Sequence, residues 1–309
     1  MLHSPLRYPG GKSDFFAAAK SIVSSAGISN AHVVEPFAGS AAVSLGLLDW
    51  GIAKSVTLLE RDPLLYAFWH CVFNHPSELI VAFQDLPITI ETWERTRSLL
   101  DMDKPDPKRL LELALAALFL NRANFSGILN AGPIGGRNQR SKYKIDCRTN
   151  KDEIISRLLA LSMLAPKVEV EFGDAVEWIE RNRKKNLFVY LDPPYFVKGS
   201  LLYRYHYRLK DHCELARVLS SAKFKWLLSY DDDPVIEYLY EDFHLSRLSF
   251  QYSVHSPKNH SELLISNFGH SLPSEYVAVT RRMRGRPRTG VYATDPPACR
   301  TSLRPCTDG

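Results

Sequence analysis

The residues best suited to chemistry in this 309-residue chain form the tetrapeptide Asp192-Pro193-Pro194-Tyr195. The exocyclic amine of a planar base is a poor nucleophile, because its lone pair is delocalised into the ring. Asp192 and the carbonyl of Pro193 could each accept one N–H of such an amine. Two fixed acceptors favour a tetrahedral nitrogen whose lone pair points at an electrophile. Since Tyr195 could stack on the base, the tetrapeptide predicts a reaction at a base amine.

The element that must position this tetrapeptide is the apolar run 187–191, which stops where Asp192 begins. A short run of apolar, partly β-branched or aromatic residues is typical of a buried strand. The two prolines prevent further strand pairing. Ligands of open α/β sheets bind beyond the carboxyl ends of strands, so we expect the tetrapeptide at that edge.

Residues 32–48 predict a strand, a small-residue turn and a helix, which together form a nucleotide-type binding corner. Gly39 lets the backbone approach a ligand closely. Glu35, near the end of the strand, could contact a cationic ligand. The three-glycine dinucleotide fingerprint is missing, which disfavours a nicotinamide or flavin cofactor.

Two further acidic residues are expected at this corner. Glu60 ends the predicted strand 56–60, where the hydroxyls of a ribose would be held. Asp174 follows the predicted strand 168–172. It could accept the amine of a cofactor's adenine, or it could cap the next helix.

The amino-terminal turn Gly10-Gly11-Lys12 could bring backbone amides and a cation to an anionic group. A P-loop is disfavoured, because the earlier glycine of that motif is missing and no strand precedes the turn.

Residues 76–149 break the alternation of strands and helices and end in a basic loop. Such a loop could face DNA phosphates, with side-chain amides reading base edges. A later stretch alternates aromatic and cationic residues, which suits an extruded base and its flanking phosphates. The candidate DNA contacts are Arg122, Asn124, Arg137, Asn138, Gln139, Arg140, Lys142, Lys144, Tyr203 and Arg204.

Composition is ordinary, and the net charge of +5 is concentrated at the carboxyl end. Residues 271–309 hold seven arginines and three acidic residues, so local clusters, not global charge, support a nucleic-acid partner. Residues 284–288 resemble an AT-hook core. No run is long enough to span a membrane. The five scattered cysteines favour a reducing compartment over a disulfide or zinc framework.

Together these motifs resemble those of the Dam-type DNA adenine methyltransferases over residues 4–268. The family's Asp-Pro-Pro-Tyr motif corresponds to 192–195, its Glu-Pro-Phe-x-Gly motif to 35–39, and its aromatic-x-Gly-Gly-Lys motif to 8–12. In the family, an Asp followed two places on by Asn usually ends the second cofactor strand. Here these residues are Glu60 and Asp62.

The alternating strands and helices, with this resemblance, imply an α/β fold: a mostly parallel Rossmann-like methyltransferase sheet with helices on both faces. The catalytic domain would comprise residues 1–75 and 150–270, with a mainly helical, loop-rich target-recognition region inserted at 76–149. Residues 271–309 would form a basic, disordered tail. The resemblance implies S-adenosyl-L-methionine and no metal. The cofactor contacts would be Tyr8, Gly10, Gly11, Lys12, Glu35, Phe37, Gly39, Glu60, Asp174 and Asp192.

The expected activity is site-specific transfer of a methyl group to the N6 amine of an adenine flipped out of double-stranded DNA. We expect a cytoplasmic, nucleoid-associated monomer of bacterial or phage origin, and a cognate restriction endonuclease is an open question. The alternatives are N4-cytosine methylation and a catalytically inactive DNA-binding relative. Methylation of RNA or a protein amide is disfavoured, because those enzymes commonly carry Asn where Asp192 stands.

Overall fold

The protein is built around one seven-stranded sheet in the computed structural model, which describes residues 3–7, 13–183, 185, 187–250, 260–270 and 272. The strands lie in the order β3-β2-β1-β4-β5-β7-β6. β1 to β5 pair in parallel, and β7 is antiparallel to β5 and β6. The prediction of a mostly parallel sheet is therefore confirmed. The strands are β1 Ala31–Pro36, β2 Ala53–Glu60, β3 Val168–Phe172, β4 Phe188–Leu191, β5 Lys225–Asp231, β6 His244–Phe250 and β7 His260–Ser266.

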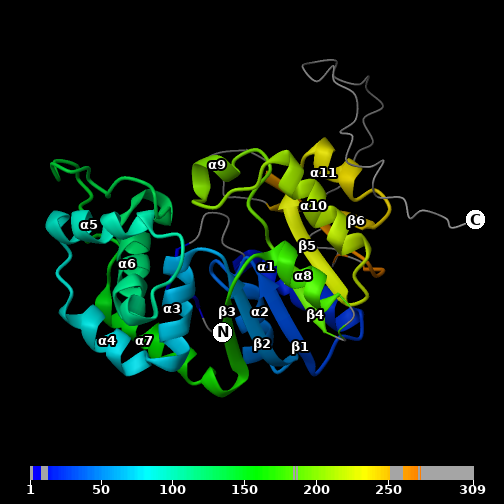
Figure 1. The fold of residues 1–309 in the computed structure, drawn as a ribbon, viewed down its shortest axis with the longest axis horizontal. Helices are drawn as coiled ribbons and strands as arrows, with labels where there is room; N and C mark the ends of the chain where they lie inside the picture. The colour runs from blue at the N-terminus through cyan, green and yellow to red at the C-terminus, as the bar shows by residue number, and fades with distance from the viewer. Residues whose placement is uncertain are drawn as a thin grey trace, which may run out of the picture.

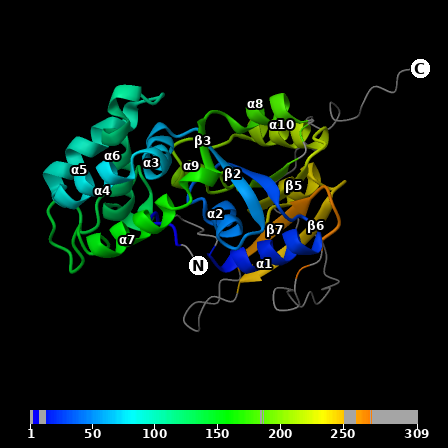
Figure 2. The same cartoon turned by 90° about the horizontal axis from the view of Figure 1, so that it is seen from below.

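The sheet separates two apolar cores, because successive side chains of a strand point to opposite faces. In β4, Phe188 and Tyr190 belong to one core, whereas Val189 and Leu191 belong to the other. Figure 2 shows α1 and α2 on one side of the sheet and α8 and α10 on the other. Among the helices that contribute to these cores are α1 Ser13–Ser25, α2 Ala42–Asp49, α3 Pro63–Asn74, α8 Ala175–Asn182, α10 Leu209–Ser220 and α11 Pro234–Leu239.

A helical region lies beside the β3 edge of the sheet (Figure 1). It contains α4 Pro76–Asp85, α5 Ile90–Arg97, α6 Leu110–Ala123 and α7 Lys151–Ser162. The strongly apolar α6 packs on α3, which joins this region to the sheet. Helix α7, which follows the predicted boundary at residue 150, packs against both α3 and α4, and the division into domains stays a prediction. The short helices are η1 Ser98–Asp101, η2 Pro107–Arg109, η3 Phe125–Gly127, η4 Ala165–Lys167 and α9 Gly199–Leu202.

Some features that the sequence singled out fall outside this description. The tail beyond Leu272, with its AT-hook-like residues 284–288, lies outside the described residues. Within the described part of the chain, no helix has both the length and the apolar character that a membrane crossing requires. Cys71, which is buried, and Cys147, which is exposed, are free thiols.

Candidate active site

The carboxyl ends of the central strands surround one cleft of about 1050 Å³, a volume that includes its open mouth. β1 and β4 are neighbours at the point where the strand order reverses, which is where open α/β sheets bind ligands. Motifs far apart in the sequence therefore meet in space. The predicted residues that line the cleft are Glu35, Phe37, Gly39, Glu60, Asp174, Asp192, Pro194, Tyr203 and Arg204.

The turn between β1 and α2 is fixed at Gly39. This residue has φ of +47°, a conformation that glycine adopts without the steric cost of a Cβ. Its carbonyl accepts a hydrogen bond from Nε1 of Trp69 at 3.0 Å. Its amide donates to Oε2 of Glu60 at 3.0 Å. The corner is thus rigid, and it presents bare backbone to the cleft.

Glu60 joins the ends of β1 and β2. Besides the amide of Gly39, its carboxylate accepts the amides of Arg61 and Asp62, each at 2.9 Å. Burial raises the pKa of Glu60 to about 7, against the opposing effect of these hydrogen bonds. Each carboxylate oxygen has two lone pairs, and one lone pair of Oε2 remains, so Glu60 could still accept one ribose hydroxyl.

Glu35 lies beneath the same turn and is almost fully buried. Its Oε2 accepts the amide of Ser44, on α2, at 2.9 Å. Burial raises the pKa of Glu35 to about 8, and the charges of Asp192 and Glu60 add to the shift. A buried acid with this pKa suits a site that receives a cation, because the cation stabilises the ionised form.

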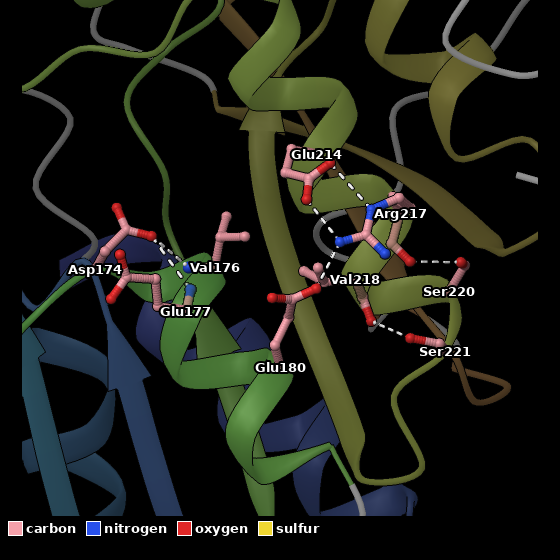
Figure 3. Close-up of polar contacts among 9 residues, drawn as sticks. All are labelled: Asp174, Val176, Glu177, Glu180, Glu214, Arg217, Val218, Ser220 and Ser221. Atoms are coloured by element: carbon pink, nitrogen blue, oxygen red, sulfur yellow. Dashed lines mark hydrogen bonds and ion pairs between the residues drawn. The ribbon is translucent and has the colours of Figure 1, made fainter. Parts of the chain in front are cut away.

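Asp174 caps α8, one of the two roles that the sequence left open. Its Oδ1 accepts the amides of Val176 at 2.9 Å and Glu177 at 3.3 Å (Figure 3). Its Oδ2 pairs with Arg61 at 2.8 Å. The capped helix is fastened to α10 by Arg217, which pairs with Glu180 and Glu214 (Figure 3). Asp174 thus lines the cleft from a fixed position.

Asp192 is held at the end of β4 by its neighbour β5. The hydroxyl of Ser229, on β5, donates to Oδ1 of Asp192 at 2.8 Å. After the tetrapeptide, the amides of Phe196 and Val197 donate to Asp231 at 2.8 and 3.1 Å. A carboxylate at the end of β5 therefore anchors the turn that follows Tyr195.

Tyr195 is not among the residues that line the cleft, but its ring meets that of Tyr203, which does line it, edge-on with centroids 6.2 Å apart. Its hydroxyl donates to Oε1 of Glu262, on β7, at 3.3 Å. Burial raises the pKa of Tyr195, so the phenol remains protonated at neutral pH. The Tyr195 ring is thus held by its polar end.

A family model for D12 class N6 adenine-specific DNA methyltransferases matches residues 8–254 of this chain. The chain belongs to this family. It is therefore an adenine-specific DNA methyltransferase, which confirms the resemblance and the activity predicted from the motifs. A search of curated proteins found no match.

Two solved structures show weak likeness to this D12 class chain. One is PH1948 from Pyrococcus horikoshii, described as a candidate RNA methyltransferase, with 13% identity and a TM-score of 0.38 over 84% of each chain. The other is TrmK, the B. subtilis M1A22 tRNA methyltransferase, with 12% identity and a TM-score of 0.34. That match covers 82% of this chain and 64% of TrmK. Neither likeness bears on the substrate.

Arg204 of the D12 class chain makes a buried ion pair, which favours a structural role over the DNA contact that the sequence suggested. Its guanidinium pairs with Asp62 at 2.8 Å, and both side chains are less than a tenth exposed. It also donates to the carbonyls of Leu100 and Met102. Asp62 in turn caps α3 through the amide of Leu64. Arg204 therefore ties the segment after the tetrapeptide to the helical region.

Two other predicted DNA contacts, Asn124 and Gln139, fix the shape of the loop that follows α6. Asn124 is fully buried; it accepts from Nε1 of Trp93 at 2.6 Å and donates to the carbonyls of Ile128 and Leu129. The amide of Gln139 donates to Ile134 and Gly136 and accepts from Ile145. Both side chains hold loop backbone, which favours a structural role over base reading.

The remaining predicted loop contacts lie on the surface. Arg137, Asn138, Arg140, Lys142 and Lys144 are exposed. Lys144 donates to the carbonyl of Gln139, and the guanidinium of Arg137 lies 5.5 Å from the Trp93 ring centroid. Their contact with DNA stays a prediction.

Asn121 and Gly127 hold the amino-terminal segment, a role that the sequence analysis missed. Oδ1 of Asn121 accepts the amide of Arg7 at 2.6 Å, and its Nδ2 donates to the Arg7 carbonyl at 2.5 Å. A Cβ on Gly127 would lie 2.4 Å from that carbonyl, so only glycine fits. Tyr8, Gly10, Gly11 and Lys12 follow directly but lie outside the described residues.

Tyr207 is a second residue that the prediction missed. Its ring lines the cleft, edge-on to Phe37 at 5.5 Å. Its hydroxyl is buried and has no hydrogen-bond partner among the described residues. A buried polar group without a partner is unusual, and a ligand in the cleft could supply one for this hydroxyl. Tyr207 belongs to the stretch of alternating aromatic and cationic residues that the sequence singles out. That pattern does not indicate which of its rings faces inward.

Proposed function

We propose that this D12 class enzyme transfers the methyl group of S-adenosylmethionine to the N6 amine of an adenine turned out of double-stranded DNA. The observation that carries the proposal is the shared cleft, which brings Gly39 and Asp192 together from separate strands. When bound, S-adenosylmethionine supplies an electrophilic methyl group on a positively charged sulfur. All other groups that the reaction needs would come from residues of this protein.

The glycine corner suits this cofactor chemically. Glu35 and Glu60 are buried carboxylates with raised pKa values, and a cationic ligand would stabilise their ionised forms. Gly39 leaves room for close backbone contact. We assign the cofactor contacts to Tyr8, Gly10, Gly11, Lys12, Glu35, Phe37, Gly39, Glu60, Asp174 and Asp192.

The end of β4 would supply the catalytic groups. Asp192, oriented by Ser229, and the carbonyl of Pro193 would each accept one N–H of the adenine amine. Asp192 would also place negative charge beside a nitrogen that becomes positive as its bond to carbon forms. Pro194 makes the turn rigid, and stacking of the base on Tyr195 would offset part of the cost of extruding it.

We assign recognition of the duplex to the helical region and its loop, with Arg122, Arg137, Asn138, Arg140, Lys142, Lys144 and Tyr203 as contacts. The exposed cations would bind phosphates and position the DNA. Arg204, Asn124 and Gln139 would act indirectly, by fixing the shape of the surface that carries these cations.

Calorimetric titration with S-adenosylmethionine tests the proposal against a catalytically inactive DNA-binding protein. An intact corner predicts saturable binding with one site per chain. A protein that binds duplex DNA but gives no heat with S-adenosylmethionine would contradict the proposed function.

Cofactor binding is expected to release protons. Because the pKa values of Glu35 and Glu60 are about 8 and about 7, both acids retain protons near neutral pH in the cofactor-free protein. A cationic ligand favours their ionised forms, so the association constant should rise by up to about tenfold per pH unit for each proton released, and level off above about pH 8. Calorimetry in buffers of different ionisation enthalpy measures the released protons directly.

Glu35 and Glu60 predict the opposite pH dependence for the stability of the cofactor-free protein. Between the ordinary pKa of 4.5 and about 8, the folded protein binds more protons at Glu35 than the unfolded chain. Its stability should therefore fall as pH rises through that window. Glu35→Gln should weaken both pH dependences. Affinity and stability that do not change with pH would refute this description of Glu35.

Tyr207→Phe is expected to stabilise the free protein and to weaken cofactor binding. The substitution removes a hydroxyl whose burial without a partner costs about 1–3 kcal/mol. It also removes one hydrogen bond to the cofactor, worth about 0.5–1.5 kcal/mol, or roughly 2- to 13-fold in affinity. Thermal unfolding and calorimetry should move in opposite directions. Unchanged affinity for S-adenosylmethionine would show that the hydroxyl has no cofactor contact.

A further inference from the structure

Four arginines gather where the amino-terminal segment meets the helical region: Arg7, Arg122 on α6, Arg148 in the loop and Arg157 on α7. Nε of Arg122 donates to the Arg148 carbonyl at 2.7 Å, and its Nη1 donates to the Pro5 carbonyl at 3.3 Å. Nη1 of Arg157 donates to the Ser4 carbonyl at 3.0 Å. These contacts draw the four residues together but neutralise none of their charge, because the acceptors are carbonyls.

The positive charges of this arginine cluster repel one another. Burial, together with the charges of Arg7, Arg157 and Arg148, lowers the pKa of Arg122 to about 10. Burial and the charge of Arg148 likewise lower the pKa of Arg7. Glu153 opposes this effect and pairs with Arg157. One carboxylate beside four guanidiniums leaves an excess of positive charge.

A buried donor in the arginine cluster also lacks an acceptor. Nη1 of Arg7 is shielded from solvent and has no hydrogen-bond partner among the described residues. Thr149, next to Arg148 in the chain, buries a hydroxyl that likewise has no such partner. Buried charges in proteins are normally paired, so the guanidinium of Arg7 lacks the acceptor that such a group usually has.

The arginine cluster lies next to the cleft. The carbonyl of Arg7 approaches Gly127 closely, and Gly127 lines the cleft. Arg148 belongs to the same loop as the exposed Arg140, Lys142 and Lys144. Phosphates that flank an extruded base would pass beside this surface.

We propose that the arginine cluster is a phosphate-binding site, and that its ligand is a backbone phosphodiester of the DNA near the target adenine. Guanidinium groups match the planar, bidentate geometry of phosphate oxygens. A phosphate would supply both the missing charge and an acceptor for Arg7. This proposal rests on the proposed function for its DNA substrate, and it adds Arg7, Arg148 and Arg157 to the expected DNA contacts.

The salt dependence of duplex binding tests the site. Each phosphate contact contributes about 0.9 to the slope of log Kd against log salt concentration. Arg148→Gln should therefore lower the slope by about 0.9, and Arg148→Lys should retain most of it. Arg148 is the best position to change, because it is exposed and Arg122 contacts its backbone. The matched control is Arg181→Gln on α8, which removes one exposed charge on the other side of the sheet and should keep the wild-type slope.

Inorganic phosphate provides a second arm that does not depend on DNA. At equal ionic strength, potassium phosphate should raise the melting temperature of the wild type and the Arg181→Gln control more than potassium chloride does. Arg148→Gln should lose part of that increase. A lower salt-dependence slope in Arg148→Gln supports a DNA phosphodiester as the ligand, whether or not the thermal effect is also lost.

The outcomes separate the possible ligands. Loss of the thermal effect with an unchanged slope supports a phosphate site but assigns it to free phosphate, not DNA. A wild-type slope together with a wild-type phosphate effect in Arg148→Gln would overturn the proposal. If the wild type fails to bind duplex DNA, the proposed function is wrong. The melting temperatures in potassium phosphate then decide by themselves whether the arginine cluster binds phosphate.

Discussion

Asp192→Ala is expected to lower the rate of methyl transfer by about 10²–10³-fold or more, while binding of S-adenosylmethionine and DNA stays largely intact. The carboxylate lines the cleft and is oriented by the hydroxyl of Ser229, so its removal would leave the adenine amine with the Pro193 carbonyl as its one proposed acceptor. Single-turnover methylation with saturating cofactor and DNA isolates the chemical step from binding.

Asp192→Asn provides the matched control, because it preserves shape and one acceptor oxygen but removes the negative charge. We expect a rate between those of the wild type and Asp192→Ala. Wild-type turnover in Asp192→Ala would show that the amine is activated elsewhere. A rate that falls only through weaker DNA binding would make Asp192 a binding residue instead.

Arg204→Ala is expected to reduce the free energy of unfolding by about 3–5 kcal/mol, the usual cost of removing one partner of a buried ion pair. The substitution leaves the Asp62 carboxylate in an almost fully buried position without its partner at 2.8 Å. It also removes the donor to the carbonyls of Leu100 and Met102 in the helical region. Urea denaturation monitored by tryptophan fluorescence measures the loss.

Arg208→Ala is the control for this prediction, since Arg208 is exposed four residues away. Its stability should lie within about 0.5 kcal/mol of the wild type. If Arg204→Ala kept wild-type stability and lost DNA affinity, Arg204 would be the DNA contact that its sequence context suggested.

The strands and the catalytic corner could be predicted because their signals are local. The apolar run before Asp192 reads as a strand in any context, and its prolines end that strand. Gly39 stands where a positive φ is needed, and Asp174 stands where a helix cap is needed. Parallel pairing then brings the ends of such strands to one edge of the sheet.

The roles of the loop residues could not be predicted, because they depend on partners distant in the sequence. Arg204 resembles a DNA contact until Asp62, 142 residues earlier, takes its guanidinium. Asn124 looks like a base reader until Trp93 and the carbonyls of its own loop surround it. A polar side chain beside a glycine-rich loop is equally typical of recognition and of loop support, and only tertiary contacts distinguish them.

The most direct test of the central claim is product analysis after incubation of the wild-type protein with duplex DNA and S-adenosylmethionine carrying an isotopically labelled methyl group. The DNA is digested to nucleosides, and these are separated by mass spectrometry. We predict that the label appears in N6-methyldeoxyadenosine and that the signal disappears with Asp192→Ala. Label in N4-methyldeoxycytidine, or no labelled nucleoside from a protein that binds both cofactor and DNA, would contradict the account.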